Sequence, residues 1–356
     1  MSNEFETLPG AVGTPPQHYG NPLGEQKALA AGSAVVDLSH RDILTITGPD
    51  RLTWLDSLTS QSIARLAPGE SSETLQLDPN GHLEFAIRIV DDGETLWLLV
   101  DEGEGMSLLT WLNKMRFMLR VEVLDRSDEF AVIGSFGDQL LPAAAPAGVP
   151  VVWHDPWTSV VAGGHQYALT PEHPAARWNY SETIIERSRL AEAAALPHAG
   201  LLALEALRIA AWRPRFATEV DEKSIPHELD WLRSAVHLTK GCYRGQETVA
   251  KVHNLGHPPR RLVLLHLDGS EGVLPVSGDQ VFVDDKHVGA ITTSALHYEL
   301  GPVALAVIKR NVDPALELAV ATDGIRVSAA QEIIVPTDAG AVADVPRLPR
   351  LGAVAR

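Results

Sequence analysis

Two turn sequences limit the folds that this chain can adopt. Pro79-Asn80-Gly81 and Asp91-Asp92-Gly93 separate three short strand-like segments, at 73–77, 83–90 and 95–100. Glycine adopts a positive φ at little cost, so such turns join neighbouring antiparallel strands, whereas parallel strands need long crossovers. The segment therefore predicts antiparallel hairpins, which belong to an α+β fold rather than to regular βαβ winding.

Helical patterns flank these hairpins. Leucines at near-helical spacing predict a helix over 51–65, with Asp50 as its N-cap. The segment 105–119 predicts an amphipathic helix, whose apolar face holds Met106, Leu109, Leu112, Met115, Met118 and Leu119. Further along the chain, 181–195 and 197–208 also have helical patterns. From Arg261 onward strands dominate, which predicts a small β-barrel of roughly 80 residues.

The length of 356 residues corresponds to two or three domains at about 150 residues each. The first residues, rich in Pro and Gly, predict a flexible N-terminal arm that we extend over 1–34. We place the barrel at 261–336. The segment 337–356, rich in Ala, Gly and Pro, predicts a flexible tail.

Composition excludes several classes of protein. The formal net charge of −17 opposes avid nonspecific binding to nucleic acid. Cys242 is the only cysteine, so the chain can form no internal disulfide and cannot by itself hold an iron–sulfur cluster. No secretory signal and no apolar run long enough to span a bilayer is visible, so we expect a cytoplasmic protein with no membrane partner.

One stretch departs from the acidic composition. Residues 231–261 hold six Lys or Arg and one acid, Glu247. Such a run is usually a solvated face, but it could also bind an anion. A direct role in binding tRNA is a further reading, which the overall charge makes the least favoured. His253 and His257 also lie here, but Gly256 and Pro258 argue against the helix that a metal-binding pair would need.

The same stretch contains the sequence KGCYRGQE at 240–247. Two glycines let the backbone approach a ligand closely, and Lys240 and Arg244 would favour the thiolate form of Cys242. Gln246 and Glu247 add groups that could orient a heterocycle. A turn with a buried, inert cysteine is the alternative. Upstream, a set of Arg and carboxylate residues either closes gaps between elements or lines a site for an anionic ligand: Glu205, Arg208, Arg213, Arg215 and Glu219.

The motif KGCYRGQE resembles the hallmark of the YgfZ family of folate-binding proteins, relatives of the glycine-cleavage aminomethyltransferase. Other segments agree with that family across about 35–310, namely Ile46–Asp50, the hairpin Asp78–Gly81, Ala206–Ala211, Arg260–Leu262 and Gly289–Ser294. Ala211 stands where the family pattern has Gly.

The resemblance implies a clover-leaf of two interleaved α+β lobes, over 35–260, and a C-terminal β-barrel around a central folate-binding hole. Tetrahydrofolate is the implied cofactor. The residues expected to bind it are Glu205, Arg208, Glu219, Lys240, Tyr243, Arg244, Gln246 and Glu247.

The resemblance also implies a function. Family members support iron–sulfur cluster assembly or repair, and thereby iron–sulfur enzymes such as those that modify tRNA, so iron–sulfur client or assembly proteins are the expected partners. Cys242 would be the reactive or persulfide-accepting residue. The alternative is a folate-dependent one-carbon transferase, with Glu84 or Glu247 as general base. Aminomethyltransferases carry a carboxylate pair after the hairpin glycine, whereas here Glu84 is the only acid and Phe85 stands beside it.

Overall fold

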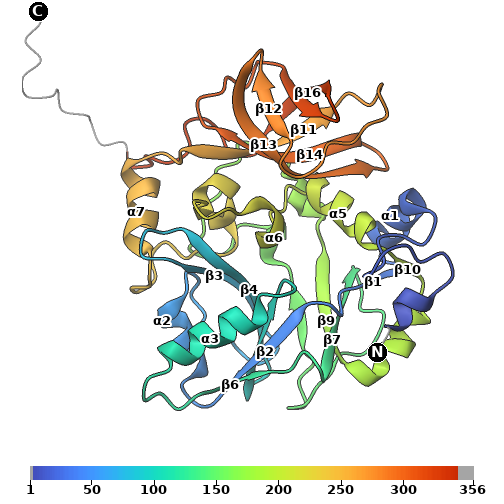
Figure 1. The fold of residues 1–356 in the computed structure, drawn as a ribbon. Coiled ribbons are helices and arrows are strands. Elements are labelled where there is room, and N and C mark those ends of the chain that lie inside the picture. Colours follow the sequence, from blue (N-terminus) through green and yellow to red (C-terminus); the bar gives the residue numbers. More distant parts are fainter. Residues whose placement is uncertain (1–2, 344–356) are drawn as a thin grey trace, which may run out of the picture.

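The computed structural model describes residues 3–343, which form two sheets and a barrel (Figure 1). Sheet one has the strand order β3-β4-β5-β2-β6. Its strands are β2 (Asp42–Thr47), β3 (Ser71–Leu77), β4 (Leu83–Asp91), β5 (Thr95–Val100) and β6 (Glu122–Asp125). All of its pairings are antiparallel, as the two turns predict.

The two predicted turns form as expected. At the β3–β4 turn, Gly81 has φ +85° and the Asp78 carboxylate accepts the backbone N–H groups of Asn80 and His82, each at 2.8 Å. At the β4–β5 turn, Gly93 has φ +96°. Positive φ is cheap only for glycine, so these residues fix both hairpins.

Sheet two has the order β10-β1-β7-β9-β8. Its strands are β1 (Val35–Asp37), β7 (Phe130–Phe136), β8 (Val152–His154), β9 (Tyr180–Glu186) and β10 (His198–Ala199). Strand β1 lies between β7 and β10, so the chain starts sheet two, leaves to build all of sheet one, and then returns. This confirms the two interleaved α+β lobes.

A closed six-stranded barrel follows, in the order β11-β14-β13-β12-β15-β16. Its strands are β11 (Arg260–Leu267), β12 (Gln280–Val283), β13 (Lys286–His297), β14 (Gly301–Lys309), β15 (Leu318–Thr322) and β16 (Ile325–Ile333). Figure 1 shows the barrel resting on both lobes. One buried cluster contains side chains from both sheets and from β11 and β14, so the three parts share a core.

The helices are short. They are α1 (Pro22–Ala30), α2 (Arg51–Leu58), α3 (Gly105–Met115), α4 (Leu190–Ala194), α5 (Leu201–Ala210), α6 (Phe216–Glu219) and α7 (Gln246–Leu255). The 3₁₀ turns are η1 (Glu4–Thr7), η2 (Pro156–Thr158), η3 (Pro174–Arg177), η4 (Arg187–Arg189), η5 (Pro226–Leu229) and η6 (Trp231–Arg233).

The apolar face predicted for α3 is right only in part, since Leu112 is buried and Leu109 is partly buried, whereas Met106 is exposed. The helix ends at Met115, four residues early, and it buries Leu108 and Leu112 against sheet one. Met118 and Leu119 lie beyond the helix and are exposed. Methionine at both ends of the segment extended the apparent periodicity past the true helix.

The helix predicted over 181–195 is also wrong in its first half. Residues 180–186 form β9, which pairs with both β7 and β8, and the helical part begins with the 3₁₀ turn Arg187–Arg189 and continues as α4. Nearly every residue of β9 is buried, so the strand lacks the alternation that would have indicated it.

The N-terminal segment is not a flexible arm over its described part. Phe5 is fully buried, Asn3 donates to Asp37, and α1 packs against α5. At the other end, the backbone N–H of Val342 donates to the carbonyl of His253 on α7. Residues 344–356 of the predicted flexible tail lie outside the described residues.

Across residues 3–343, no helix has both the length and the apolar character that crossing a bilayer requires.

Candidate functional site

The loop that holds KGCYRGQE is fixed by a buried lysine. Lys240 Nζ donates to the backbone carbonyls of Asp56, Thr59 and Gln61, at 2.6, 2.8 and 2.7 Å. A lysine ammonium has three protons, so this arrangement uses all of them. Burial lowers the pKa of Lys240, and Asp56 offsets part of that shift. The cation expected to bind a ligand instead anchors the loop to the end of α2.

Two further motif residues also hold the loop. Tyr243 is buried in the common core, with Lys240 Nζ 5.5 Å from the centre of its ring, and burial raises the pKa of its hydroxyl. Gln246 Nε2 donates to the Lys240 carbonyl at 3.3 Å and closes the loop on itself. These three side chains therefore position the loop.

The loop also docks on the β3–β4 turn. Gly245 has φ +83° and precedes the first residue of α7. A Cβ at this position would lie 2.7 Å from the Asp78 carbonyl oxygen and 3.1 Å from the Gly81 Cα. Only glycine permits both the backbone conformation and this approach.

The remaining motif residues face solvent. Cys242 is a free, exposed thiol, and Glu247 is exposed on the first turn of α7. Arg244 Nη1 lies 3.5 Å from Glu84 Oε2, and both side chains are half-exposed. The structure thus brings Glu84 beside the motif, although the two are far apart in the sequence.

The basic stretch 231–261 is not a basic surface. Arg233 and Arg261 are buried, and Lys240 is anchored as described above. Arg260 is paired with Asp221 and Glu228. Within the described residues, only Arg244 and Lys251 among the six cations are neither buried nor firmly paired. The stretch therefore lacks the basic surface that a direct contact with tRNA would need.

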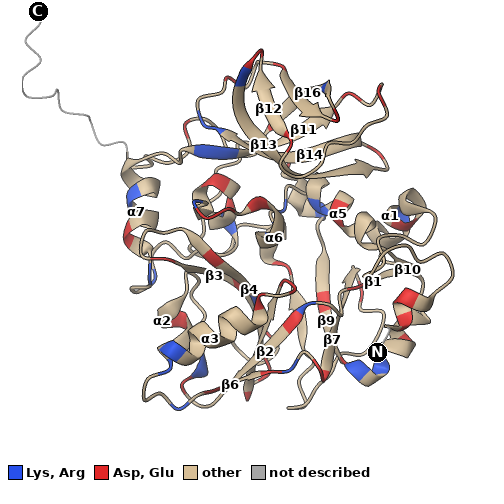
Figure 2. Cartoon of the chain, viewed as in Figure 1, with Lys and Arg blue, Asp and Glu red and all other residues tan. Residues whose placement is uncertain are grey.

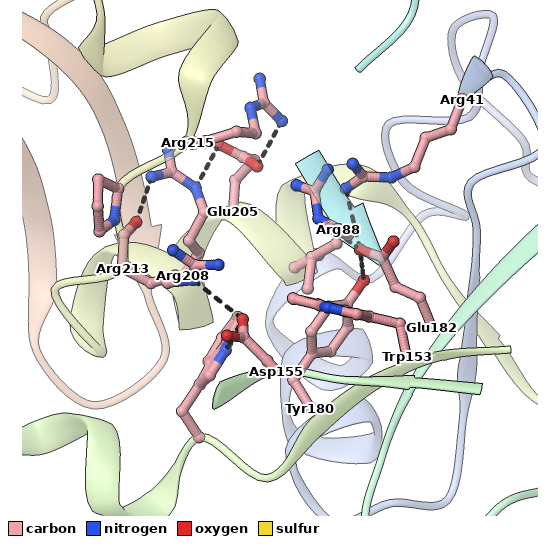
Figure 3. A pocket seen from close by; sticks show the side chains of 13 residues that line it. Arg41, Arg88, Trp153, Asp155, Tyr180, Glu182, Glu205, Arg208, Arg213 and Arg215 are labelled. Atoms are coloured by element: carbon pink, nitrogen blue, oxygen red, sulfur yellow. Dashed lines mark hydrogen bonds and ion pairs between the residues drawn. The ribbon is translucent and has the colours of Figure 1, made fainter. Parts of the chain in front are cut away.

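A cavity of about 30 Å³ lies where β4 meets β8, β9 and α5 (Figure 3). Five arginines, three carboxylates and three aromatic rings dominate its lining. These residues are Arg41, Arg88, Arg208, Arg213, Arg215, Asp155, Glu182, Glu205, Trp153, Trp178 and Tyr180.

One side of the cavity contains two of the predicted cofactor-binding residues. Glu205 accepts from Arg208 Nη2 and from Arg215 Nη1, each at 2.8 Å. Arg208 Nη1 also donates to Glu219 at 2.8 Å. Burial alone would raise the pKa of Glu205, but Arg208 and Arg215 outweigh burial and hold it below its usual value. Both carboxylates are therefore matched to arginines.

The opposite side is built on Glu182, which is fully buried. Its Oε1 lies 3.2 Å from Arg41 Nη2 and 3.5 Å from Arg88 Nε. Both arginines also contact Asp101. Although burial would raise the pKa of Asp101, these two cations hold it well below its usual range.

Four lining residues keep an unused polar atom. In the part of the chain that the structure describes, Arg41 Nε, Glu182 Oε2, Arg213 Nη1 and Arg215 Nε are buried without a hydrogen-bond partner. Buried polar groups are nearly always paired, and leaving one unpaired costs free energy. The residues that line the cavity therefore hold three donors and one carboxylate acceptor that the described part of the protein does not use.

A chain of contacts links this cavity to the motif. Arg244 contacts Glu84, and the ring of the next residue, Phe85, stacks on Phe216 at 6.5 Å between centroids. Phe216 directly follows Arg215 of the cavity. Strand β4 thus connects the cavity, which Arg88 lines, with Glu84, the residue that contacts Arg244.

A second cavity, of about 320 Å³, lies between α6 and the barrel. Its lining includes Glu219, Asp221, Arg260, His287 and Lys309. Glu219 faces this cavity and also binds Arg208 of the first, so one ion pair separates the two spaces. Arg260 and Lys309 are already used, since Lys309 Nζ donates to the His287 carbonyl.

Sequence reasoning missed Arg41, Arg88 and Glu182. A signal was present for two of them. Arg88 is a charged residue inside the apolar strand β4, and Glu182 occupies the same kind of position in β9. Charges at such positions are rarely buried without a partner, so they point to an internal ion network.

Comparison with known proteins agrees with this architecture. The chain is 28% identical over 314 residues to an aminomethyltransferase of Herpetosiphon aurantiacus, with 83% of each chain covered. It is 27% identical over 306 residues to that of Symbiobacterium thermophilum, with 79% of each covered. No protein-family model matches the chain.

A solved structure has the same fold. It is the glycine cleavage system aminomethyltransferase T of Bartonella henselae, with a TM-score of 0.69, 17% identity, and coverage of 90% of this chain and 91% of that one. These relatives support the aminomethyltransferase-like superfamily. The predicted α+β class with a C-terminal barrel is thereby confirmed, while membership of the YgfZ family stays a prediction.

Proposed function

We propose that this chain binds tetrahydrofolate, with the pterin ring at the arginine-lined cavity. A pterin presents N–H donors and ring acceptors along one edge, and it carries a tail with carboxylates. The observation that carries the proposal is the set of four unpartnered atoms, because Glu182 Oε2 can accept from the ring while Arg41 Nε and Arg213 Nη1 can donate to it.

The lining suits an aromatic ligand in other ways. Trp153, Trp178 and Tyr180 contribute aromatic rings to the lining, and the Arg88 guanidinium lies 5.5 Å from the centre of the Trp153 ring. The space of about 30 Å³ holds no more than one or two waters, so the ligand must displace side chains. Arg215 is the most suitable to move, since it is partly exposed and forms the edge of the lining.

The tail would run toward the motif. Arg88 of the cavity and Glu84 beside Arg244 belong to the same strand, and guanidinium groups bind carboxylates in a two-point geometry. Arg244 holds Glu84 only at 3.5 Å, so that weak contact can be exchanged for a ligand carboxylate. The similarity to aminomethyltransferases supports the same ligand class.

Calorimetric titration with tetrahydrofolate and with the stable 5-formyl form tests this proposal. Arg244→Gln and Glu182→Gln should each weaken binding about tenfold or more. The matched control is Arg326→Gln, on a half-exposed barrel arginine far from the cavity in sequence. No measurable binding to wild type would end the proposal, and so would equal weakening by the control.

We further propose that folate binding serves an accessory role in iron–sulfur cluster assembly or repair, with Cys242 as the reactive thiol. The loop is held in place by the side chains of Lys240, Tyr243 and Gln246, while Cys242 remains exposed. A thiol that packed as a small core residue would be buried, so exposure favours a chemical role.

Cys242→Ser tests the thiol. The variant should unfold at the wild-type temperature and bind 5-formyl-tetrahydrofolate normally, yet fail to restore an iron–sulfur enzyme activity in cells that lack the native protein. Ser57→Ala changes an exposed side chain of α2, outside the loop, and serves as the control for the assay. Full restoration by Cys242→Ser rules out the thiol role without touching the binding proposal.

One-carbon transfer is the second candidate. It is favoured because the similarity to an aminomethyltransferase covers 83% of each chain. Glu84 would act as base, since its side chain is half-exposed and its Oε2 accepts from Gln76 Nε2 at 2.7 Å. Purified protein should then consume an aminomethyl donor in the presence of saturating tetrahydrofolate, and Glu84→Gln should abolish turnover while retaining binding. If the protein binds tetrahydrofolate but forms no product from the donor, one-carbon transfer is excluded.

A further inference from the structure

The turn after α3 displays two large apolar side chains to solvent. The N–H of Leu119 donates to the Arg116 carbonyl at 3.1 Å and closes a tight turn. Phe117 and Met118 form its tip, and their side chains are 91% and 94% exposed. Met115 and Leu119 are partly exposed beside them. We call residues 114–120 the apolar–basic turn.

The backbone at the tip of this turn is left-handed, as is common just after the last residue of a helix, where the residue is usually glycine. Phe117 has φ +47°, a left-handed conformation that is unfavourable for a bulky residue and natural for Gly or Asn. The ring gains no burial in return. A glycine or asparagine would end the helix at lower cost, so the end of the helix does not by itself account for an exposed phenylalanine here.

The same turn carries a local positive charge. Lys114, Arg116 and Arg120 fall within seven residues that contain no acid. Arg120 is held by Asp50 at 2.7 Å, whereas Lys114 and Arg116 are exposed and take part in no ion pair among residues 3–343. Figure 2 shows blue at this end of α3. In a chain of net charge −17, two free cations beside an exposed Phe-Met pair are unusual.

We propose that the apolar–basic turn is a docking surface for a partner protein whose own surface combines acidic residues with an apolar pocket. Phe117 and Met118 would fill the pocket, and Lys114 and Arg116 would pair with the acids. Aromatic residues, Met and Arg are enriched at interface centres, where such anchors supply most of the binding energy.

The charge of the whole chain favours a protein over a membrane. An anionic bilayer is an extended plane, so it would face other parts of a chain of net charge −17 as well as the turn. A protein partner contacts the turn locally, and charges beyond about 8 Å are screened at physiological ionic strength.

This site is separate from the proposed folate site. None of residues 114–120 lines either cavity. The turn lies at the outer end of α3 in the sheet-one lobe, away from the barrel (Figure 1). The inference therefore stands or fails independently of folate binding.

Selection of a random displayed peptide library on the full chain tests the proposal. Enriched peptides should carry several acids together with an aromatic or large aliphatic residue. Their affinity should fall at least about tenfold for Phe117→Gly/Met118→Ser and for Lys114→Glu/Arg116→Glu. Leu169→Ser, at another strongly exposed apolar residue, and Lys286→Glu, at another exposed lysine, should leave affinity unchanged.

The variants are expected to fold, since glycine relieves the positive φ at position 117. Peptides without acids, or peptides that bind the turn variants as well as wild type, overturn the proposal. So does co-sedimentation with phosphatidylserine vesicles that the Phe117→Gly/Met118→Ser change abolishes, which would make the turn a membrane contact. Concentration-dependent dimerisation lost in the same variant would assign it to a second copy of the chain.

Discussion

Arg208 donates through Nη1 to Glu219 Oε2 across 2.8 Å, and both side chains are buried. The other oxygen of the same carboxylate accepts the hydroxyl of Thr293, on barrel strand β13, at 2.6 Å. One carboxylate therefore ties α5 and α6 to the barrel. It also sets the orientation of an arginine that lines the proposed ligand cavity.

Glu219→Gln should be strongly destabilising. The new amide nitrogen would face the donors that now share the Glu219 carboxylate. Arg208, which is buried, would keep only one of its two carboxylate partners. Removing one partner of a buried pair costs about 3–5 kcal/mol. Denaturant unfolding measures this, and Glu192→Gln, which disturbs the exposed pair with Arg189, should cost less than about 1 kcal/mol. Equal losses in the two variants would contradict the anchoring role.

Gly245→Ala should disturb the loop more than its backbone angle alone explains. A Cβ here meets the Asp78 carbonyl oxygen at 2.7 Å. Gly324 is the matched control, because its φ of +78° is similar and nothing lies within 4 Å of its added Cβ. In both variants, holding alanine at a positive φ should lower the unfolding free energy by about 1 kcal/mol. Gly245→Ala should lose at least about 1 kcal/mol more, because its Cβ also meets the Asp78 carbonyl. A loss no greater than in Gly324→Ala means that the turn and loop do not pack as described.

Lys240→Met should lower stability although it removes a charged side chain from a buried place. Three backbone carbonyls around the end of α2 would lose their donor. We expect a loss of about 1–3 kcal/mol by thermal unfolding, and greater hydrogen exchange at residues 240–247. Lys251→Met, at an exposed position on α7, should change stability by no more than about 0.5 kcal/mol.

Asp230 predicts a pH dependence of stability. Burial raises its pKa from the usual value to about 7, with the Tyr167 N–H, Arg233 and the Ala168 N–H opposing that shift. The folded state thus retains a proton that the unfolded state releases near pH 3.8. The stability this gives is complete below that pH and is lost as pH rises toward 7.

Asp230→Asn should remove this loss. Asn tolerates the φ of +53° found at position 230, and it cannot ionise. Between about pH 4 and pH 8 the variant should lose less unfolding free energy than wild type, by a few kcal/mol at most. Asp285→Asn, at an almost fully exposed side chain, provides the comparison. Parallel curves for Asp230→Asn and wild type would exclude ionisation of Asp230 in this range.

Local turn chemistry predicted the hairpins because the sequence itself carries their cause. Gly81 and Gly93 supply the positive φ, and Asp78 supplies the side-chain acceptor. The sequence of β9 predicts a helix because burial on both faces erases the alternation that identifies a strand. The sequence predicts too late an end for α3 because exposed Met118 mimics a core position.

The site was predictable in part. The resemblance pointed to Glu205, Arg208 and Glu219, and the structure brings these three into one buried network. It did not point to Glu182, whose partners are Arg88, from the other sheet, and Arg41, from the connection that leads into that sheet. Contacts between sheets depend on how the lobes interleave, which no local pattern encodes. Likewise, the sequence does not reveal that four of the six cations in 231–261 are buried or paired.

The position of β1 has a consequence during synthesis. Sheet one can assemble as soon as β6 has left the ribosome, since all its strands fall between residues 42 and 125. Strand β1 must wait for β10, at 198–199, before its second edge is covered. The first strand is therefore an unpaired edge for much of translation, which makes the nascent chain a natural client for chaperones that shield such edges.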